Sequence, residues 1–311
     1  MSGKPRRSGF VAAVGWLGAA IVLAAALTAC SRPATANGDP AKIQQQAQAA
    51  LARWDKAVAA AGGEPAFVPV GELTLMIGGD WGPDQQFGYN AKVALMSGDF
   101  EAAVSLPADT PPDGQAKWQD GSTRTVGLIS SQQALADMKA DGAAAGPCKD
   151  CVPLEITGAQ LTTGTFQTAR GPVDAPAWEF TLQGTPVKIQ RLAVSHLVKV
   201  VPPAFDENNP AQGIRIDSAT TRAGGLVLTV TFEGAPADAG GACGSDYTAE
   251  AVESASAVVV IVTEHPHFGL SWACTAVGAF RTADATLSAP LGNRAVLEVT
   301  QGMPVSVTLT P

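Results

Sequence analysis

The spacing of apolar residues predicts one amphipathic helix near the start of the mature chain. Between Asp39 and Gly62 the apolar positions recur every three or four residues, at Ile43, Ala47, Leu51, Trp54 and Val58. This period places them on one face of a helix. Asp39-Pro40 is typical of a helix start, and Gly62-Gly63 of a helix end. We expect this helix to pack on the core, because its polar face lacks the Lys and Arg residues that anionic lipid favours.

The rest of the chain predicts short strands separated by turn residues, interrupted by one more helix. Ser130 and Gln133 form the pattern of a capping box, and Gly142 closes that helix. From residue 214 onward the pattern is almost purely β, with about seven short strands, as in a small sandwich or barrel. The candidate strands of the first part are 72–77, 91–96, 123–128, 154–161, 177–183 and 187–201.

These patterns predict a mainly β protein, α+β overall, built in two parts. The first part, residues 39–200, is expected to be a β-rich domain with two helices. The second, residues 214–311, is expected to be an antiparallel β-sandwich or barrel. The Pro-, Asn- and acid-rich stretch 201–213 is the expected linker between them. A chain of 311 residues is long enough for two such cores.

The first thirty residues predict export and lipid attachment. Lys4, Arg6 and Arg7 precede an uncharged apolar run, residues 10–27, and the chain then reads Leu27-Thr28-Ala29-Cys30. This tetrad resembles the lipobox of bacterial lipoproteins, in which the Cys thiol is acylated and the preceding peptide is removed. The resemblance implies a signal peptide over 1–29 and lipidation at Cys30. The small, polar residues after Cys30, which include Pro and Gly, predict a flexible leash over 30–38. An uncleaved membrane anchor is the alternative.

The charge of the mature chain limits the classes of partner that we expect. Removal of Lys4, Arg6 and Arg7, the only charged residues before Cys30, changes the formal net charge from −8 to −11. The mature chain has no cluster of basic residues, so we expect no nucleic-acid partner. The expected partners are the membrane, through the lipid anchor, and an unknown envelope ligand or protein. The expected location is extracytoplasmic, on the outer face of the cell membrane.

The remaining four cysteines predict disulfides, because their number is even and the expected compartment is oxidising. Of three pairings we favour Cys148 with Cys151 and Cys243 with Cys274. The second closes a loop that chain entropy values at about 3.5 kcal/mol. A redox-active Cys148–Cys151 pair is the sharper alternative, and it predicts a thiol-disulfide oxidoreductase. The residues after Cys151 read as a strand, however, rather than the helix that lowers a thiol pKa.

Two further groups of side chains are candidate sites. Glu264-His265-Pro266-His267 has the residue types of a zinc or copper site and suggests metal handling, although a loop with ordinary histidines fits as well. Trp81, Phe87 and Tyr89 lie among glycines and could form a stacking platform for a ligand. Alternatively these rings fold onto the core. We predict no cofactor.

No catalytic motif supports an enzyme. A Gly-x-Ser-x-Gly elbow, a phosphate loop and a dinucleotide fingerprint are all missing from the sequence. With the lipobox, several short segments resemble a group of uncharacterised secreted lipoproteins of actinobacteria: 79–81, 90–92, 146–154, 157–159, 175–181, 247–254 and 289–296. The resemblance implies an envelope location and carries over no catalytic residues. We therefore expect a lipid-anchored binding or structural module.

Overall fold

A computed structural model describes residues 38–63, 67–146, 152–237, 240–241, 243–267, 274 and 277–310. The predicted signal peptide and Cys30 lie outside the described residues. The described residues belong to one compact unit, 34–311. Strands outweigh helices in it and form two seven-stranded sheets, which confirms the mainly β fold class. Within these ranges, no helix combines the length and the apolarity needed to cross a membrane.

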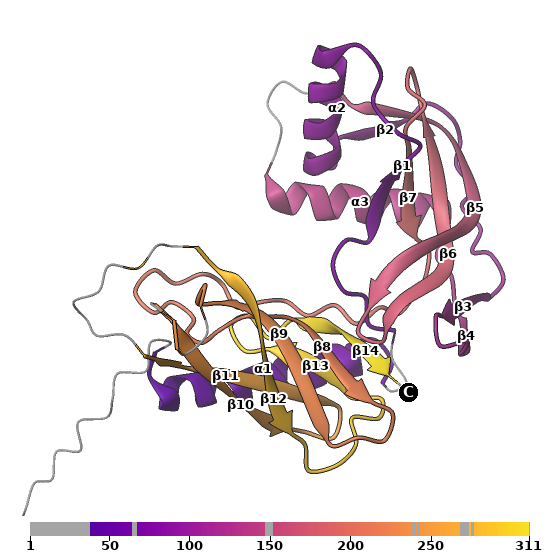
Figure 1. Cartoon of the computed structure of the whole chain (residues 1–311). Helices are drawn as coiled ribbons and strands as arrows, with labels where there is room; N and C mark the ends of the chain where they lie inside the picture. The colour runs from indigo at the N-terminus through magenta and orange to yellow at the C-terminus, as the bar shows by residue number, and fades with distance from the viewer. Residues whose placement is uncertain are drawn as a thin grey trace, which may run out of the picture. The chain divides into compact units, whose positions relative to one another are not determined.

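The first sheet is organised around two long strands, β5 (Leu154–Thr168) and β6 (Gly171–Leu182), which pair as an antiparallel hairpin. Its strand order is β1-β7-β6-β3-β4, with β5 on the other edge of β6 and β2 parallel to β5. Helices α2 and α3 cover one face (Figure 1), and a second apolar cluster lies on the other. The remaining elements are β1 (Thr74–Ile77), α2 (Gln85–Ser97), β2 (Phe100–Ala102), β3 (Gly114–Trp118), β4 (Thr123–Val126), α3 (Ser131–Ala145) and β7 (Lys188–Leu192).

Helix α2 corrects the expectation of a strand over 91–96 and of only two helices in the first part. The Asp84 side chain accepts hydrogen bonds from the backbone amides of Gln86 and Phe87, which caps the helix. Gly98 ends it with a left-handed φ of 68°. The apolar pattern of 91–96 therefore did not determine the local structure. Two local signals did, a polar N-cap and a C-terminal glycine, and both favour a helix.

The second sheet has the strand order β10-β11-β13-β14-β8-β9-β12 and is nearly closed into a barrel. The rings of Phe232 on β9 and Tyr247 on β10 lie 4.8 Å apart across the interior. Two pairings, β11 with β13 and β14 with β8, are parallel, so the expected purely antiparallel domain is corrected to a mixed sheet. The strands are β8 (Ile216–Arg222), β9 (Val227–Gly234), β10 (Ser245–Glu253), β11 (Ala257–Pro266), β12 (Ala279–Thr286), β13 (Ala295–Glu298) and β14 (Pro304–Thr310).

Strand β11 explains why one apolar run separates two cores. Val258, Val260 and Val262 point into the barrel interior, whereas Val259 and Ile261 contact helix α1 (Pro40–Ala60). Because successive strand residues face opposite sides, a strand buried on both faces has the continuous apolar sequence seen here.

Helix α1 itself packs on the second sheet, not on the first (Figure 1). Its predicted apolar stripe is buried, with Trp54 only 1% exposed. Asp39 caps it by accepting a hydrogen bond from the Ala41 amide. The grouping of residues 39–60 with the first sheet is therefore corrected. Sequence spacing fixes the buried face of a helix, but the partner of that face lies about 200 residues further along the chain.

Candidate functional site

The three aromatic residues predicted as a platform do not form one. Trp81 is 3% exposed and belongs to the core of the first sheet, where Phe87 packs against it edge-on at 6.5 Å. Tyr89 is 67% exposed and lies on α2, two residues from Phe87 and so on another face of the helix. The Trp81 indole nitrogen is buried, and no described residue accepts a hydrogen bond from it. The inward-folded alternative describes Trp81 and Phe87, and Tyr89 stands alone.

The side chains of Glu264, His265 and His267 each have a different partner on β10. Glu264 accepts a hydrogen bond from Ser245 at 2.7 Å, and His265 lies 2.9 Å from the Thr248 hydroxyl. His267 lies 2.8 Å from the Asp246 carboxylate. Among the described residues, no group of three His, Cys, Asp or Glu side chains converges as a metal ion requires. These cross-strand pairs serve the β10–β11 hairpin.

The predicted bond between Cys243 and Cys274 is confirmed. It links the residues before β10 to the connection between β11 and β12, 31 positions apart in sequence. Cys148 and Cys151 lie outside the described residues, as does Cys30. The redox hypothesis for Cys148 and Cys151 stays a prediction.

A groove along α1 is the described cavity best suited to a ligand. Its volume is about 430 Å³, within the range of small-molecule sites, roughly 300–1,000 Å³. Helix α1 forms one wall, the linker the second, and the turn between β13 and β14 the third. The lining residues are Lys42, Gln45, Gln46, Ala49 and Arg53, then Pro203, Ala204, Phe205, Asp206, Asn209 and Ala211, and Thr300 and Gln301.

The helical wall of the groove is a single polar stripe. Lys42, Gln45, Gln46, Ala49 and Arg53 recur at intervals of three, one, three and four residues, which aligns them on one side of α1. Lys42 and Arg53 stand near the two ends of this stripe. At about 1.5 Å per residue, the stripe is about 16 Å long. The spacing was visible in the sequence, but nothing there showed what faced it.

The linker wall is held by hydrogen bonds to α1. The Gln46 side chain donates to the Gln212 carbonyl at 2.9 Å and accepts from the Gln212 amide at 3.0 Å. Lys42 Nζ donates to the Pro210 carbonyl at 3.0 Å. These contacts hold the linker beside the helix and leave Phe205 81% exposed at the rim. Contact with a ligand in the groove would remove part of this apolar ring from water, which is favourable.

The turn that forms the third wall is built around a buried carboxylate. Glu298 is 2% exposed and accepts hydrogen bonds from the amides of Thr300, Gln301 and Met303 and from the Thr300 hydroxyl. The turn in turn presents the Gln301 carbonyl to Arg53 Nη2 at 3.2 Å. The four donors replace the water that the carboxylate lost on burial, and their bonds fix the path of the turn.

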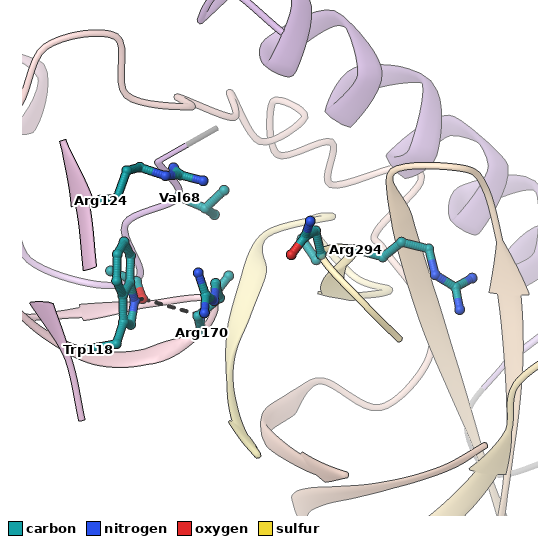
Figure 2. Close-up of a pocket in the computed structure, with 9 residues that line it drawn as sticks. Val68, Trp118, Arg124, Arg170 and Arg294 are labelled. Atoms are coloured by element: carbon teal, nitrogen blue, oxygen red, sulfur yellow. Dashed lines mark hydrogen bonds between the residues drawn. The ribbon is translucent and has the colours of Figure 1, made fainter. Parts of the chain in front are cut away.

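A second, much smaller space lies next to an arginine–tryptophan cluster made by Trp118, Arg124 and Arg170. The guanidinium carbons of Arg170 and Arg124 lie 4.7 and 5.8 Å from the Trp118 ring centre. Figure 2 shows both guanidinium groups beside Trp118, whereas Arg294 is directed away. The space holds about 30 Å³, enough for one or two water molecules. Sequence reasoning missed this cluster, because its members lie up to 52 positions apart and carry no motif.

Comparison with known proteins adds no assignment: no family model, no curated protein and no solved structure matches this chain.

Proposed function

We propose that the protein is a lipid-anchored binding module on the outer face of the cell membrane, and that the α1 groove binds an amphipathic anion. The observation that carries the binding site is a groove of about 430 Å³ that combines two cations with an exposed aromatic ring. Lys42 and Arg53, at opposite ends of the groove, each supply charge-assisted donors for an acidic group, and they outnumber the one carboxylate in the lining, Asp206. Phe205 and Ala49 supply apolar surface for the other end of the ligand.

The short distance between the predicted lipid anchor and the groove supports an amphipathic anion as the ligand. Residues 30–38 can extend over at most about 30 Å, and the groove begins at Lys42, in the first turn of α1. A body held on so short a leash stays close to the lipid headgroups. Amphipathic anions concentrate at that surface, because their apolar part partitions out of water.

The anchor is tested by mass spectrometry of the protein purified from membranes. The expected N-terminus is Cys30, with a mass increment for at least two acyl chains, and the Cys30→Ser variant should be released from the membrane. If the protein in the membrane fraction still began at residue 1, the uncleaved segment would be the anchor and the lipid-anchor hypothesis would be wrong. That result would leave the groove hypothesis in place.

The groove is tested with 1-anilinonaphthalene-8-sulfonate, an anion with an apolar ring system. Because residues 34–311 form one compact unit, the titration uses the soluble chain 31–311. We expect saturable fluorescence enhancement that the Ala49→Trp variant abolishes, since an indole fills the groove. Ala52→Trp is the matched control, because Ala52 is exposed on α1 and does not line the groove. Equal binding by both variants would place the probe elsewhere and reject the assignment.

The two alternative functions gain no support from the described residues. The thiol-disulfide oxidoreductase hypothesis depends on Cys148 and Cys151, which lie outside them. Metal handling by Glu264, His265 and His267 would require the pairs with β10 to open first. Equilibrium dialysis of the purified chain against zinc and copper tests the metal-handling hypothesis directly. Metal that binds to the wild type and not to the His265→Ala variant would support this hypothesis.

A further inference from the structure

One edge of the first sheet is open along the middle of β5. The start of β5 pairs with β2 on this edge, and the Ala103 amide donates to the Ile156 carbonyl at 3.0 Å. The end of β5 pairs with the segment 68–70, where the Val70 amide donates to the Gln167 carbonyl at 2.9 Å. Between these contacts, residues 157–166 form strand pairs only with β6 among the described residues. This gap corresponds to about 33 Å of extended chain.

The pairing pattern shows which backbone groups face the gap. The Gln167 carbonyl and the Ala169 amide both bond to the segment 68–70, so residues 167 and 169 direct these groups away from β6. The β5–β6 register is regular over 158–168, and strand residues alternate with a period of two. The residues that therefore direct an amide and a carbonyl into the gap are Ala159, Leu161, Thr163 and Thr165.

The open edge lacks the features that normally protect an edge strand. Charged side chains and prolines hinder strand addition in natural proteins, but residues 156–169 include neither. The edge strands β1 and β4 are short, with four residues each. Leu161 and Thr163 are exposed on the open part of β5. An open row of donors and acceptors of this length is a template for another strand.

The two ends of the gap limit what fits into it. β2 and the segment 68–70 lie on the same edge of β5, so they stop an added strand after about ten residues. In a second copy of the chain, β5 is a strand of 15 residues with the same two covers on its edge. Those covers would collide with the covers of the first copy. A short extended peptide meets no such obstruction.

The charge beside the gap indicates the chemistry of that peptide. Glu101 on β2 and Glu155 on β5 are aligned in the parallel register, and both are exposed. No described residue forms an ion pair with either carboxylate. Like charges on neighbouring strands repel each other, so a cation at this end of the gap is favourable.

We infer that the open edge of β5 binds an extended peptide by strand addition, with a Lys or Arg of the peptide beside Glu101 and Glu155. The peptide backbone pairs with the four outward residues of β5, and its central residues are uncharged and β-branched. The α1 groove is lined by α1, the linker and the β13–β14 turn. The two sites share no residue, so either assignment can fail alone.

The probe is the capped peptide Lys-Thr-Val-Thr-Thr-Val-Thr-Lys, which reads the same in both directions and so presents a Lys to the glutamates in either orientation. Hydrogen exchange of the 31–311 chain, followed by NMR, reports each amide separately. The amides of residues 159, 161, 163 and 165 should exchange fast in the free chain and at least about tenfold more slowly with saturating peptide. Those of 160, 162 and 164 should exchange slowly throughout, because they face β6. This alternation is specific to strand addition.

Thr163→Pro removes one outward amide and takes no hydrogen bond from β6. It should weaken peptide binding about tenfold or more. Met76→Pro is the matched control on β1, at another edge of the same sheet. The Leu192 amide donates to the Leu73 carbonyl, so by the period of two the Met76 amide faces away from β7. This variant should bind the peptide like wild type.

The double variant Glu101→Gln with Glu155→Gln tests the charge and leaves the edge intact. It should weaken binding of the Lys-ended peptide about threefold. Wild type should prefer this peptide to one with Glu at both ends, and equal affinities would reject the assigned chemistry. A peptide N-methylated at its six central residues should not bind, which tests the backbone pairing even if Thr163→Pro does not fold.

The inference is overturned if the peptide does not bind, or if it binds without alternating protection. It is also overturned if the N-methylated peptide or a folded Thr163→Pro chain binds as well as the original pair. Protection that appears without peptide and grows with protein concentration would assign the edge to a second copy of the chain instead.

Discussion

Arg191 on β7 and Asp141 on α3 form an ion pair with Nη2 and Oδ2 2.6 Å apart, in which the arginine side chain is 3% exposed and the aspartate 52%. Arg191 Nη1 also donates to the Thr74 hydroxyl on β1 at 2.9 Å. One buried guanidinium thus joins an edge strand, its neighbour and the helix that covers them. A buried charge is tolerated only with such partners.

The first prediction concerns this pair. Asp141→Asn should lower the free energy of unfolding by about 2 kcal/mol, less than for a fully buried pair because Asp141 is half exposed. Arg191→Met should cost less than Arg191→Ala, since it keeps the packing of the stem. The double variant Asp141→Asn with Arg191→Met should lose less unfolding free energy than the two single variants lose in sum. Urea unfolding of the wild type and the four variants measures these losses, and additive losses would mean that the two side chains are not coupled.

The second prediction concerns the disulfide of the second sheet. Cys274→Ser should lower the free energy of unfolding by about 3.5 kcal/mol, because the unfolded chain regains the entropy of a loop 31 positions long. Thermal unfolding with and without a reductant measures this. The wild-type chain in reductant should match Cys274→Ser in oxidising buffer. Unequal losses would point to the serine itself, to the remaining thiol, or to the second predicted bond, between Cys148 and Cys151, which the reductant would also break.

Most of the strands were predictable, because their signals are local. The runs that form β4 and the starts of β5 and β11 alternate or stay apolar over a few residues, and turn residues bound them. Helix α2 was not predicted, because the apolar residues of 91–96 also fit a strand; the local signal for the helix is its N-cap, Asp84. The position of α1 was not predictable from periodicity, since the period fixes the buried face and not its partner.

The candidate sites depended even more on contacts distant in sequence. The Glu264-His265-Pro266-His267 segment is compact in sequence, but strand pairing gives each side chain its own partner on β10. Lys42 and Phe205 are more than 160 positions apart, yet they line the same groove. Arg170 is a single charge in a turn and belongs to no sequence motif. Only the pairing of β5 with β6 and of β6 with β3 brings it to Trp118.

The third prediction is a pH dependence at Glu253. Burial alone would raise the pKa of this carboxyl, but hydrogen bonds from Arg294 and the Ser288 amide outweigh burial and hold the pKa below its ordinary value of 4.5. The ionised form therefore stabilises the folded state above that value, and this contribution is lost as the pH falls through the lower, folded-state pKa. Glu253→Gln should cost about 2 kcal/mol near neutral pH.

Denaturant unfolding of wild type and Glu253→Gln at about pH 7 and about pH 3 measures the effect. The difference between the two chains should shrink in acid, because protonation of the wild-type carboxyl removes its charge. Glu250→Gln is the control, because Glu250 is exposed on the same strand. A difference of the same size at both pH values would show that Glu253 acts through its shape rather than through its charge.

The fourth prediction links the β13–β14 turn to the groove. Gly302 has a φ of 72°, and a Cβ there would lie 2.8 Å from both the Ala50 Cβ and the Arg53 Nη2. Gly224 has a nearly equal φ of 74° with nothing within 4 Å. Both Gly→Ala variants should incur the backbone strain of a left-handed residue, about 1–2 kcal/mol. Only Gly302→Ala should also push the turn away from α1.

Gly302→Ala should therefore have a lower free energy of unfolding than Gly224→Ala. It should also bind 1-anilinonaphthalene-8-sulfonate several-fold more weakly than wild type. The turn that moves carries the Gln301 carbonyl, which holds Arg53 in the wall of the groove. Gly224→Ala should bind the probe like wild type, because its turn, between β8 and β9, does not line the groove. If Gly302→Ala loses stability but binds normally, the third wall does not shape the site, and the ligand contacts only the helix and the linker.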